Sequence, residues 1–105
     1  EKAKDEWRKE FLIYLKAIEK DDFIGVQNYA RSIIGKDGIM NPPTSASLTQ
    51  MGYENYPEAL YNVLKRVDRE LKERNLDIPL YVTENGIATS DDEERVVFIE
   101  KALSG

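Results

Sequence analysis

The sequence contains neither cysteine nor histidine. The absence of cysteine excludes disulfide bonds and thiolate metal ligands. The absence of histidine removes the commonest general base, the usual catalytic triads and most zinc sites. If this chain performs acid–base or nucleophilic chemistry, carboxylates are therefore the side chains best suited to carry it.

The chain also lacks a long apolar run and an excess of positive charge. No stretch of about 18 apolar residues is present, which argues against a membrane span. The 20 acidic residues outnumber the 15 lysines and arginines, so the net charge is −5. This balance argues against nucleic acid or an anionic membrane as the main partner. No spaced cluster of metal ligands stands out, and we expect neither a metal nor a cofactor.

The chain opens at Glu1 without a methionine, which indicates that the numbering begins inside a larger product. No signal peptide is visible, and we expect a cytoplasmic location. Of the 105 residues, 41 % are hydrophobic and 33 % are charged, as is typical of a folded protein. This length allows one domain at most, or a piece of one.

Periodic spacing of the apolar residues predicts helices separated by strands. Steps of three and four predict helices over residues 1–20, 57–74 and 92–103. Runs of β-branched and aromatic residues predict strands over residues 23–29 and 80–83. Residues 30–50 show no clear period, and we expect a long and poorly ordered loop there. The faces expected to be buried are Ala3, Trp7, Phe11, Leu12, Leu15 and Ile18 in the first helix, Leu60, Val63, Leu64, Val67 and Leu71 in the second, and Val96, Ile99, Ala102 and Leu103 in the third.

Two helix starts carry local signals. Pro57 suits the first position of the second helix, where its missing N–H costs nothing. Asp91 suits the N-cap of the third helix, and Glu94 three residues later makes a pattern close to a capping box.

Strands separated by helices imply a parallel sheet. Two parallel strands are too few for a stable sheet and leave open edges. The chain is therefore expected to be a single-domain piece, residues 1–105, of a larger α/β structure.

A carboxylate stands where the second strand meets a turn. Leu80 to Thr83 fit a packed strand, and Asn85-Gly86 is a strong turn signal. Glu84 is therefore expected at the rim of the sheet, where a rigid strand can aim it into a cleft. The first strand also ends in polar residues, up to Tyr29, as strands do when they deliver side chains to a site.

Four stretches in order resemble glycoside hydrolase family 1, the β-glucosidase family. Residues 81–86, Tyr-Val-Thr-Glu-Asn-Gly, resemble the nucleophile motif of that family. Residues 22–29 resemble its strand-six segment, residues 49–60 resemble its Met-Gly-Trp-Glu-x-Tyr-Pro-Glu-Gly-Leu stretch, and residues 91–99 resemble the helix after the nucleophile loop. Gln27 replaces the usual Asn, Asn28 a Tyr and Tyr53 a Trp. The first change bears on contacts to the sugar or to the catalytic carboxylates, and the other two on packing.

The resemblance implies an α/β fold, a segment of a (β/α)₈ TIM barrel that holds about strands six and seven with their helices. It implies that Glu84 is the nucleophile of a retaining β-glycosidase, which attacks the anomeric carbon of a β-glycoside. A donor such as the Tyr29 hydroxyl would favour the charged carboxylate and orient it, although Tyr29 could also be a rim aromatic that fills space. Gln27 and Asn85 are the expected substrate contacts, and Asn85 could instead serve only the turn.

The acid/base glutamate of the family lies in an Asn-Glu-Pro motif, which this sequence does not contain. Because retaining hydrolysis needs two carboxyl groups, the remaining barrel segments are expected partners, in the same or another chain. The alternative is a non-catalytic barrel fragment that self-associates to cover its open edges. A carbohydrate-binding module without hydrolysis has little support, because Trp7 falls on a face expected to be buried.

Overall fold

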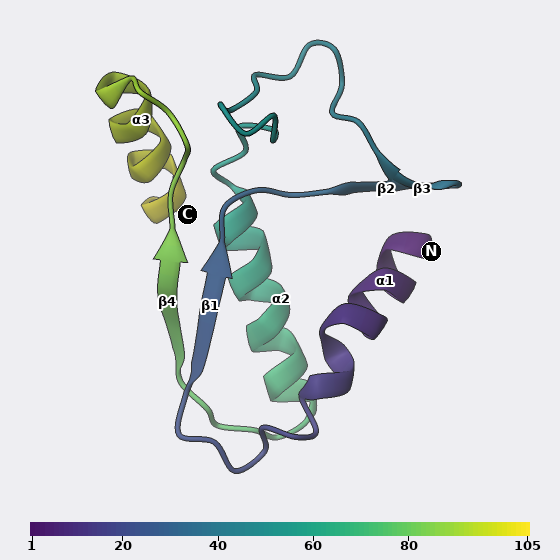
Figure 1. Ribbon diagram of the computed structural model, residues 1–105. Coiled ribbons are helices and arrows are strands. Elements are labelled where there is room, and N and C mark those ends of the chain that lie inside the picture. The colour runs from purple at the N-terminus through teal and green to yellow at the C-terminus, as the bar shows by residue number, and fades with distance from the viewer.

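The computed structural model describes residues 1–105 and is organised around two parallel strands. Strand β1 (Ile24–Asn28) pairs with β4 (Leu80–Asn85), although 51 residues separate them in the chain, counting Tyr29 to Pro79. Figure 1 shows the two strands side by side and pointing the same way, so that their carboxyl ends meet at one edge. The parallel arrangement predicted from the sequence is confirmed.

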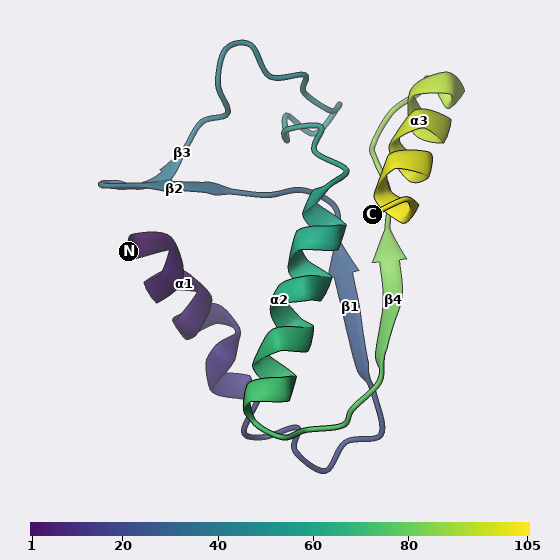
Figure 2. The same ribbon diagram turned by 180° about the vertical axis from the view of Figure 1, so that it is seen from behind.

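Helix α2 (Ala59–Glu73) covers one face of this pair of strands. It lies behind the strands in Figure 1 and in front of them in Figure 2. Leu60, Val67 and Leu71 of its predicted stripe are buried, and Val63 and Leu64 are partly buried. The predicted face is confirmed, whereas the helix begins two residues later than Pro57, which lies in the preceding turn.

The predicted first helix is only half as long in the structure. Helix α1 (Lys2–Glu10) ends where Phe11 leaves the helical region, at φ −133° and ψ −56°. A short 3₁₀ helix, η1 (Leu12–Tyr14), and a series of turns replace the rest. Tertiary packing explains the break, because Leu15 is fully buried against α2 and the irregular chain also brings Phe11 and Leu12 to that cluster. Phe11, Ile13 and Tyr14 are aromatic or β-branched and have a lower helix propensity than alanine or leucine, so less free energy is lost when the helix ends there.

The prediction of a structureless loop over residues 30–50 is wrong in part. A β-hairpin forms from β2 (Ile33–Gly35) and β3 (Gly38–Met40), with Lys36 and Asp37 between them. Gly38 has φ +120°, which a residue with a side chain rarely adopts. Isoleucines on both sides of a short polar turn that is followed by glycine favour a hairpin, but the strands are too short to show a period.

Helix α3 (Asp92–Leu103) has the predicted bounds, and Asp91 is its N-cap. The Asp91 carboxylate accepts hydrogen bonds from the backbone N–H groups of Glu93 and Glu94. The predicted buried face is wrong in part: Phe98 and Ala102 are buried, whereas Val96 and Leu103 are exposed. Four consecutive apolar residues at 96–99 leave no single apolar face, so the face against α2 is chosen by packing and not by periodicity.

The opposite face of the two strands carries no helix in either view (Figures 1 and 2). Phe23 and Tyr81 are exposed there and meet edge to face, with ring centroids 5.5 Å apart. The radius of gyration is 15.2 Å, compared with about 13 Å for a compact domain of this length. No helix in the structure is both long and apolar enough to cross a membrane. The molecule is therefore an open layer of helices on strands, with one face of the sheet bare.

Candidate active site

The Glu84 carboxylate is held by two side-chain donors at the carboxyl ends of the strands. Gln27 on β1 donates from Nε2 to Glu84 Oε1 at 3.0 Å. The Tyr29 hydroxyl, one residue beyond β1, donates to Glu84 Oε2 at 2.7 Å. Three of the residues singled out in the sequence therefore meet in one cluster, and each carboxylate oxygen has one neutral donor.

A β-bulge in β4 puts Glu84 on the face where those donors lie. Val26 pairs with Val82, but the next residue of β1, Gln27, pairs with Glu84, so Thr83 has no partner. With strict alternation from Tyr81, Glu84 would point to the face that α2 covers. The extra residue changes the phase of the strand and brings Glu84 onto the bare face, beside Gln27.

Gly25 makes room for the bulged residue. The Thr83 hydroxyl donates to the Val26 carbonyl oxygen at 3.3 Å, which ties the bulge to β1. A Cβ atom at position 25 would lie 3.0 Å from Thr83 Cγ2, closer than carbon atoms normally approach. A glycine at this position therefore allows the two strands to approach each other just before Glu84.

The pKa of the Tyr29 hydroxyl is raised above its ordinary value of 10.0. The main cause is the hydrogen bond that this hydroxyl donates to Glu84, and desolvation and the charge of Glu84 act in the same direction. Deprotonation would turn a donor into an anion facing another anion. Tyr29 therefore remains a protonated donor throughout the neutral pH range.

Asn85 lies apart from this cluster. Its Nδ2 donates to the Asn28 carbonyl oxygen at 2.8 Å, and the two residues are paired across the strands. In that register Asn85 belongs to the face opposite Gln27 and Glu84. The geometry favours the interpretation in which Asn85 joins the ends of the strands over the one in which it contacts a substrate.

An ion pair beyond β1 was not foreseen from the sequence. Arg31 donates from Nε to Glu54 Oε2 at 2.7 Å and from Nη2 to Glu54 Oε1 at 3.0 Å. The guanidinium also stacks 3.7 Å above the Tyr56 ring. The hydrogen bonds from Arg31 lower the pKa of Glu54, and the same bonds raise the pKa of Arg31. Local periodicity offers no signal for a pair 23 residues apart.

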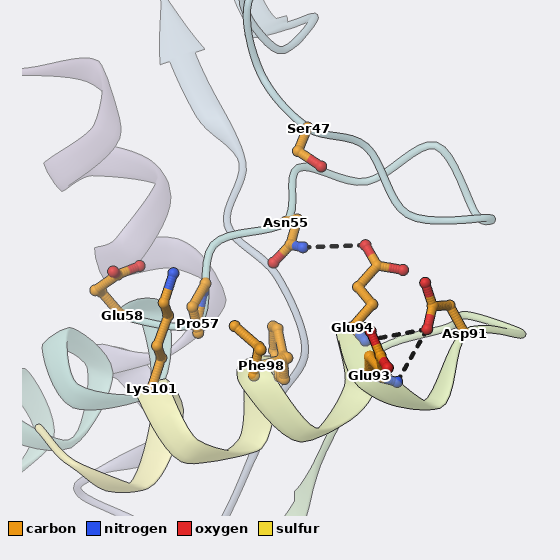
Figure 3. A pocket seen from close by; sticks show the side chains of 10 residues that line it. Ser47, Asn55, Pro57, Glu58, Asp91, Glu93, Glu94, Phe98 and Lys101 are labelled. Carbon is orange, nitrogen blue, oxygen red and sulfur yellow. Dashed lines mark hydrogen bonds between the residues drawn. The ribbon is translucent and has the colours of Figure 1, made fainter.

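Two hollows lie among the loops at this end of the molecule. One, of about 350 Å³, is next to the cluster and is lined mainly by apolar residues, including Tyr29, Met51, Tyr53 and Gly86. The other, of about 490 Å³, lies between α3 and the loop before α2 (Figure 3).

Glu94 projects into the second hollow and joins two loops. It accepts hydrogen bonds from Asn55 Nδ2 at 3.3 Å, as Figure 3 shows, and from the Thr89 hydroxyl. The predicted capping box is therefore incomplete, because the backbone N–H of Asp91 donates to Thr89 instead of to Glu94.

Comparison with known proteins adds sequence relatives and solved structures. No family model matches the chain. It is 36 % identical over 94 residues to a β-galactosidase of Sulfolobus acidocaldarius, covering 74 % of this chain and 18 % of that protein. It is 34 % identical over 80 residues to β-glucosidase A of Thermotoga maritima, covering 70 % and 17 %. The crystal structure of the β-glycosidase BGL167 superposes with a TM-score of 0.84 at 36 % identity, covering 99 % of this chain and 24 % of that one.

The chain is a relative of the β-glucosidases and β-glycosidases. It has the fold of an α/β segment of the barrel of these proteins. The chain spans less than a fifth of the length of the curated relatives named above. The bare face of β1 and β4 is accordingly the face of a partial structure.

Proposed function

We propose that this chain is the part of a family 1 retaining β-glycosidase that supplies the nucleophile, Glu84. It corresponds to about strands six and seven of the barrel with their helices. The observation that carries the proposal is the Glu84 carboxylate at the rim of parallel strands, held by Gln27 and Tyr29 at 3.0 and 2.7 Å. Active sites of such barrels lie at the carboxyl ends of the strands.

In the proposed reaction Glu84 attacks the anomeric carbon of a β-glycoside. A bond forms between a carboxylate oxygen and that carbon while the glycosidic bond breaks, and a second carboxylic acid protonates the leaving oxygen. Water then attacks the anomeric carbon, gives its proton to the second carboxylate and releases Glu84. The second carboxyl group must lie about 5–5.5 Å from Glu84, and the remaining barrel segments supply it from the same or another chain.

The two donors support the nucleophile in different ways. Both are neutral, so they orient the carboxylate without adding a positive charge that would bind it as an ion pair. Gln27 projects from the strand itself, whereas Tyr29 reaches back from the residue after β1. Because such donors lose strength when the carboxylate becomes a neutral ester, they favour release of Glu84 in the second step.

Trapping the intermediate tests this proposal. The complete protein is incubated with a 2-deoxy-2-fluoro-β-glycoside that has a good leaving group, and its peptides are analysed by mass spectrometry. We expect one sugar adduct, on the peptide that contains Glu84. The substitution Glu84→Ala should lower kcat by about a thousandfold or more, as loss of a nucleophile generally does. Glu93→Ala, at an exposed acid on α3, is the matched control and should leave kcat unchanged. An adduct elsewhere, or full activity of Glu84→Ala, contradicts the proposal.

A second candidate is a non-catalytic fragment that self-associates. Exposure of Phe23 and Tyr81 on the bare face of the strands favours it, because each strand of the pair also has one unpaired edge.

A further inference from the structure

We propose that Arg31 and Glu54 are positioning residues for Glu84, acting through Tyr29. This inference rests on the proposed role of Glu84 as the nucleophile. Neither residue contacts Glu84 itself. Their double hydrogen bond, at 2.7 and 3.0 Å, joins the chain after β1 to the loop before α2.

Tyr29 depends on its surroundings for its position. It lies beyond the last residue of β1, its side chain is half exposed, and the bond to Glu84 is the one side-chain hydrogen bond that it makes. On one side the ring lies against Gly86, where an added Cβ atom would be 3.9 Å from Tyr29 Cε1. The backbone of residues 29–31 therefore determines where the hydroxyl points.

The backbone around Tyr29 is anchored before and after that residue. Before it, the Asn28 carbonyl oxygen accepts the hydrogen bond from Asn85 at 2.8 Å. After it, the bidentate contact of Arg31 with Glu54 fixes the chain two residues further on. A bidentate pair restrains direction as well as distance, so its loss frees one end of the segment that carries Tyr29.

The backbone of Glu54 also closes a loop that lines the smaller hollow beside Tyr29. A β-bridge between Leu48 and Glu54 closes a short loop, and the backbone N–H of Thr49 donates to the Tyr53 carbonyl oxygen inside it at 2.8 Å. Thr49, Met51 and Tyr53 of this loop line the smaller hollow together with Tyr29.

The same loop is tied to the segment that follows the nucleophile. The Gln50 backbone N–H donates to the Ala88 carbonyl oxygen at 3.1 Å. The Arg31–Glu54 pair and this hydrogen bond together connect three segments: the chain after β1, the loop before α2 and the turn after β4.

The chain contains a matched control for this ion pair. Arg66 and Glu70 on α2 are also 2.7 Å apart, and the Glu70 side chain is 10 % exposed, as is that of Glu54. The Arg66–Glu70 pair contacts neither Tyr29 nor Glu84. Glu54→Gln and Glu70→Gln therefore each remove one charge from a similar pair, and only the first alters the support of Tyr29.

Steady-state kinetics of the complete protein test the inference. We expect Glu54→Gln to lower kcat by between about 10- and 100-fold, because small misplacements of a catalytic group have effects of this size. KM should change less than kcat, and Glu70→Gln should keep the kcat of the wild type. Thermal melts of both variants show whether their losses of stability are comparable. If Glu54→Gln does not fold, Arg31→Lys, which keeps the charge and loses the bidentate contact, takes its place with the same expected loss.

A double-mutant cycle separates positioning from a purely structural role. If Glu54 acts through the Tyr29 hydroxyl, Glu54→Gln should cost almost nothing further in a Tyr29→Phe background. Losses that multiply, or equal losses in Glu54→Gln and Glu70→Gln, overturn the inference. If Glu84→Ala is inactive while Glu54→Gln keeps the kcat of the wild type, this inference is overturned and the proposed function stands. Full activity of Glu84→Ala instead overturns the proposed function on which it rests.

Discussion

Gln27 and Tyr29 each donate one hydrogen bond to Glu84, but they depend on different parts of the chain. Gln27 is a strand residue, and its amide reaches Glu84 across the register of the sheet. At this position the resembled family has an asparagine, which is shorter by one methylene. Tyr29 depends on irregular chain that other segments must hold. We therefore expect Gln27 to keep its position when the loops are disturbed and Tyr29 to lose it.

The raised pKa of Tyr29 gives a test at the residue scale. The Tyr29 hydroxyl should titrate above its ordinary value of 10.0, because its deprotonation breaks the hydrogen bond to Glu84 and adds a second negative charge. Its contribution to stability should be complete below pH 10 and should be lost as the pH rises through the pKa of the folded state. Nuclear magnetic resonance of the protein labelled with ¹³Cζ-tyrosine measures the titration. The signal that disappears in the Tyr29→Phe variant is the one from Tyr29.

A control variant isolates the cause. In Glu84→Gln the charge is absent, and the pKa of Tyr29 should move back toward its ordinary value. An unchanged pKa would show that Glu84 does not act on this hydroxyl.

At the scale of elements, the bulge in β4 and the start of α3 flank the nucleophile. The bulge at Thr83 turns Glu84 toward its donors, and Gly25 on β1 leaves the space that the bulge needs. Seven residues after Glu84, the chain enters α3 through the Asp91 cap. Strand β4 thus orients the nucleophile, and the Asp91 cap fixes the end of the turn where α3 begins.

Removal of this cap gives a prediction about stability. Asp91→Ala deprives the backbone N–H groups of Glu93 and Glu94 of their acceptor. The free energy of unfolding should fall by about 1 kcal/mol, the usual effect of losing an N-cap. Urea denaturation of the complete protein measures the change. Asp91→Asn keeps an acceptor oxygen and should stay close to the wild type, and an equal loss in both variants would rule out the cap as the cause.

At the scale of the whole molecule, burial is scarce. Only 11 of the 105 residues are buried, and six of these form two clusters of three, one where Leu15 meets α2 and one where α2 meets α3. One face of the sheet and both strand edges are open. One face of the sheet is therefore packed against α2 and the other is exposed, as expected for a segment of a closed barrel.

The open face predicts the behaviour of this chain when it is produced by itself. The 105-residue chain should self-associate, because strand edges and apolar side chains favour pairing with another copy. Light scattering should give a mass greater than that of one chain. Replacing Phe23 and Tyr81 by serine should reduce association, whereas Val96→Ser, at an equally exposed site on α3, should not. A stable monomer with a cooperative melt would contradict the prediction.

The sequence by itself determined the elements whose signals are local. The stripe of α2, the bounds of α3, the Asp91 cap and the strand that carries Glu84 each follow from residues only a few positions apart. Backbone geometry imposes these short periods, so they can be recognised without a partner. The turn of the hairpin, Lys36-Asp37 followed by Gly38, was also a local signal, but its strands of three residues are too short to show a period.

Only the tertiary structure decided how those elements meet. The bulge at Thr83 is visible only in the pairing with β1, and the partners Arg31 and Glu54 are brought together by packing. The end of α1 and the buried face of α3 likewise follow from contacts with α2. These features depend on the sum of many weak contacts between distant residues, which no local pattern records. The sequence therefore led to Glu84, and the fold supplied the donors and the ion pair that surround it.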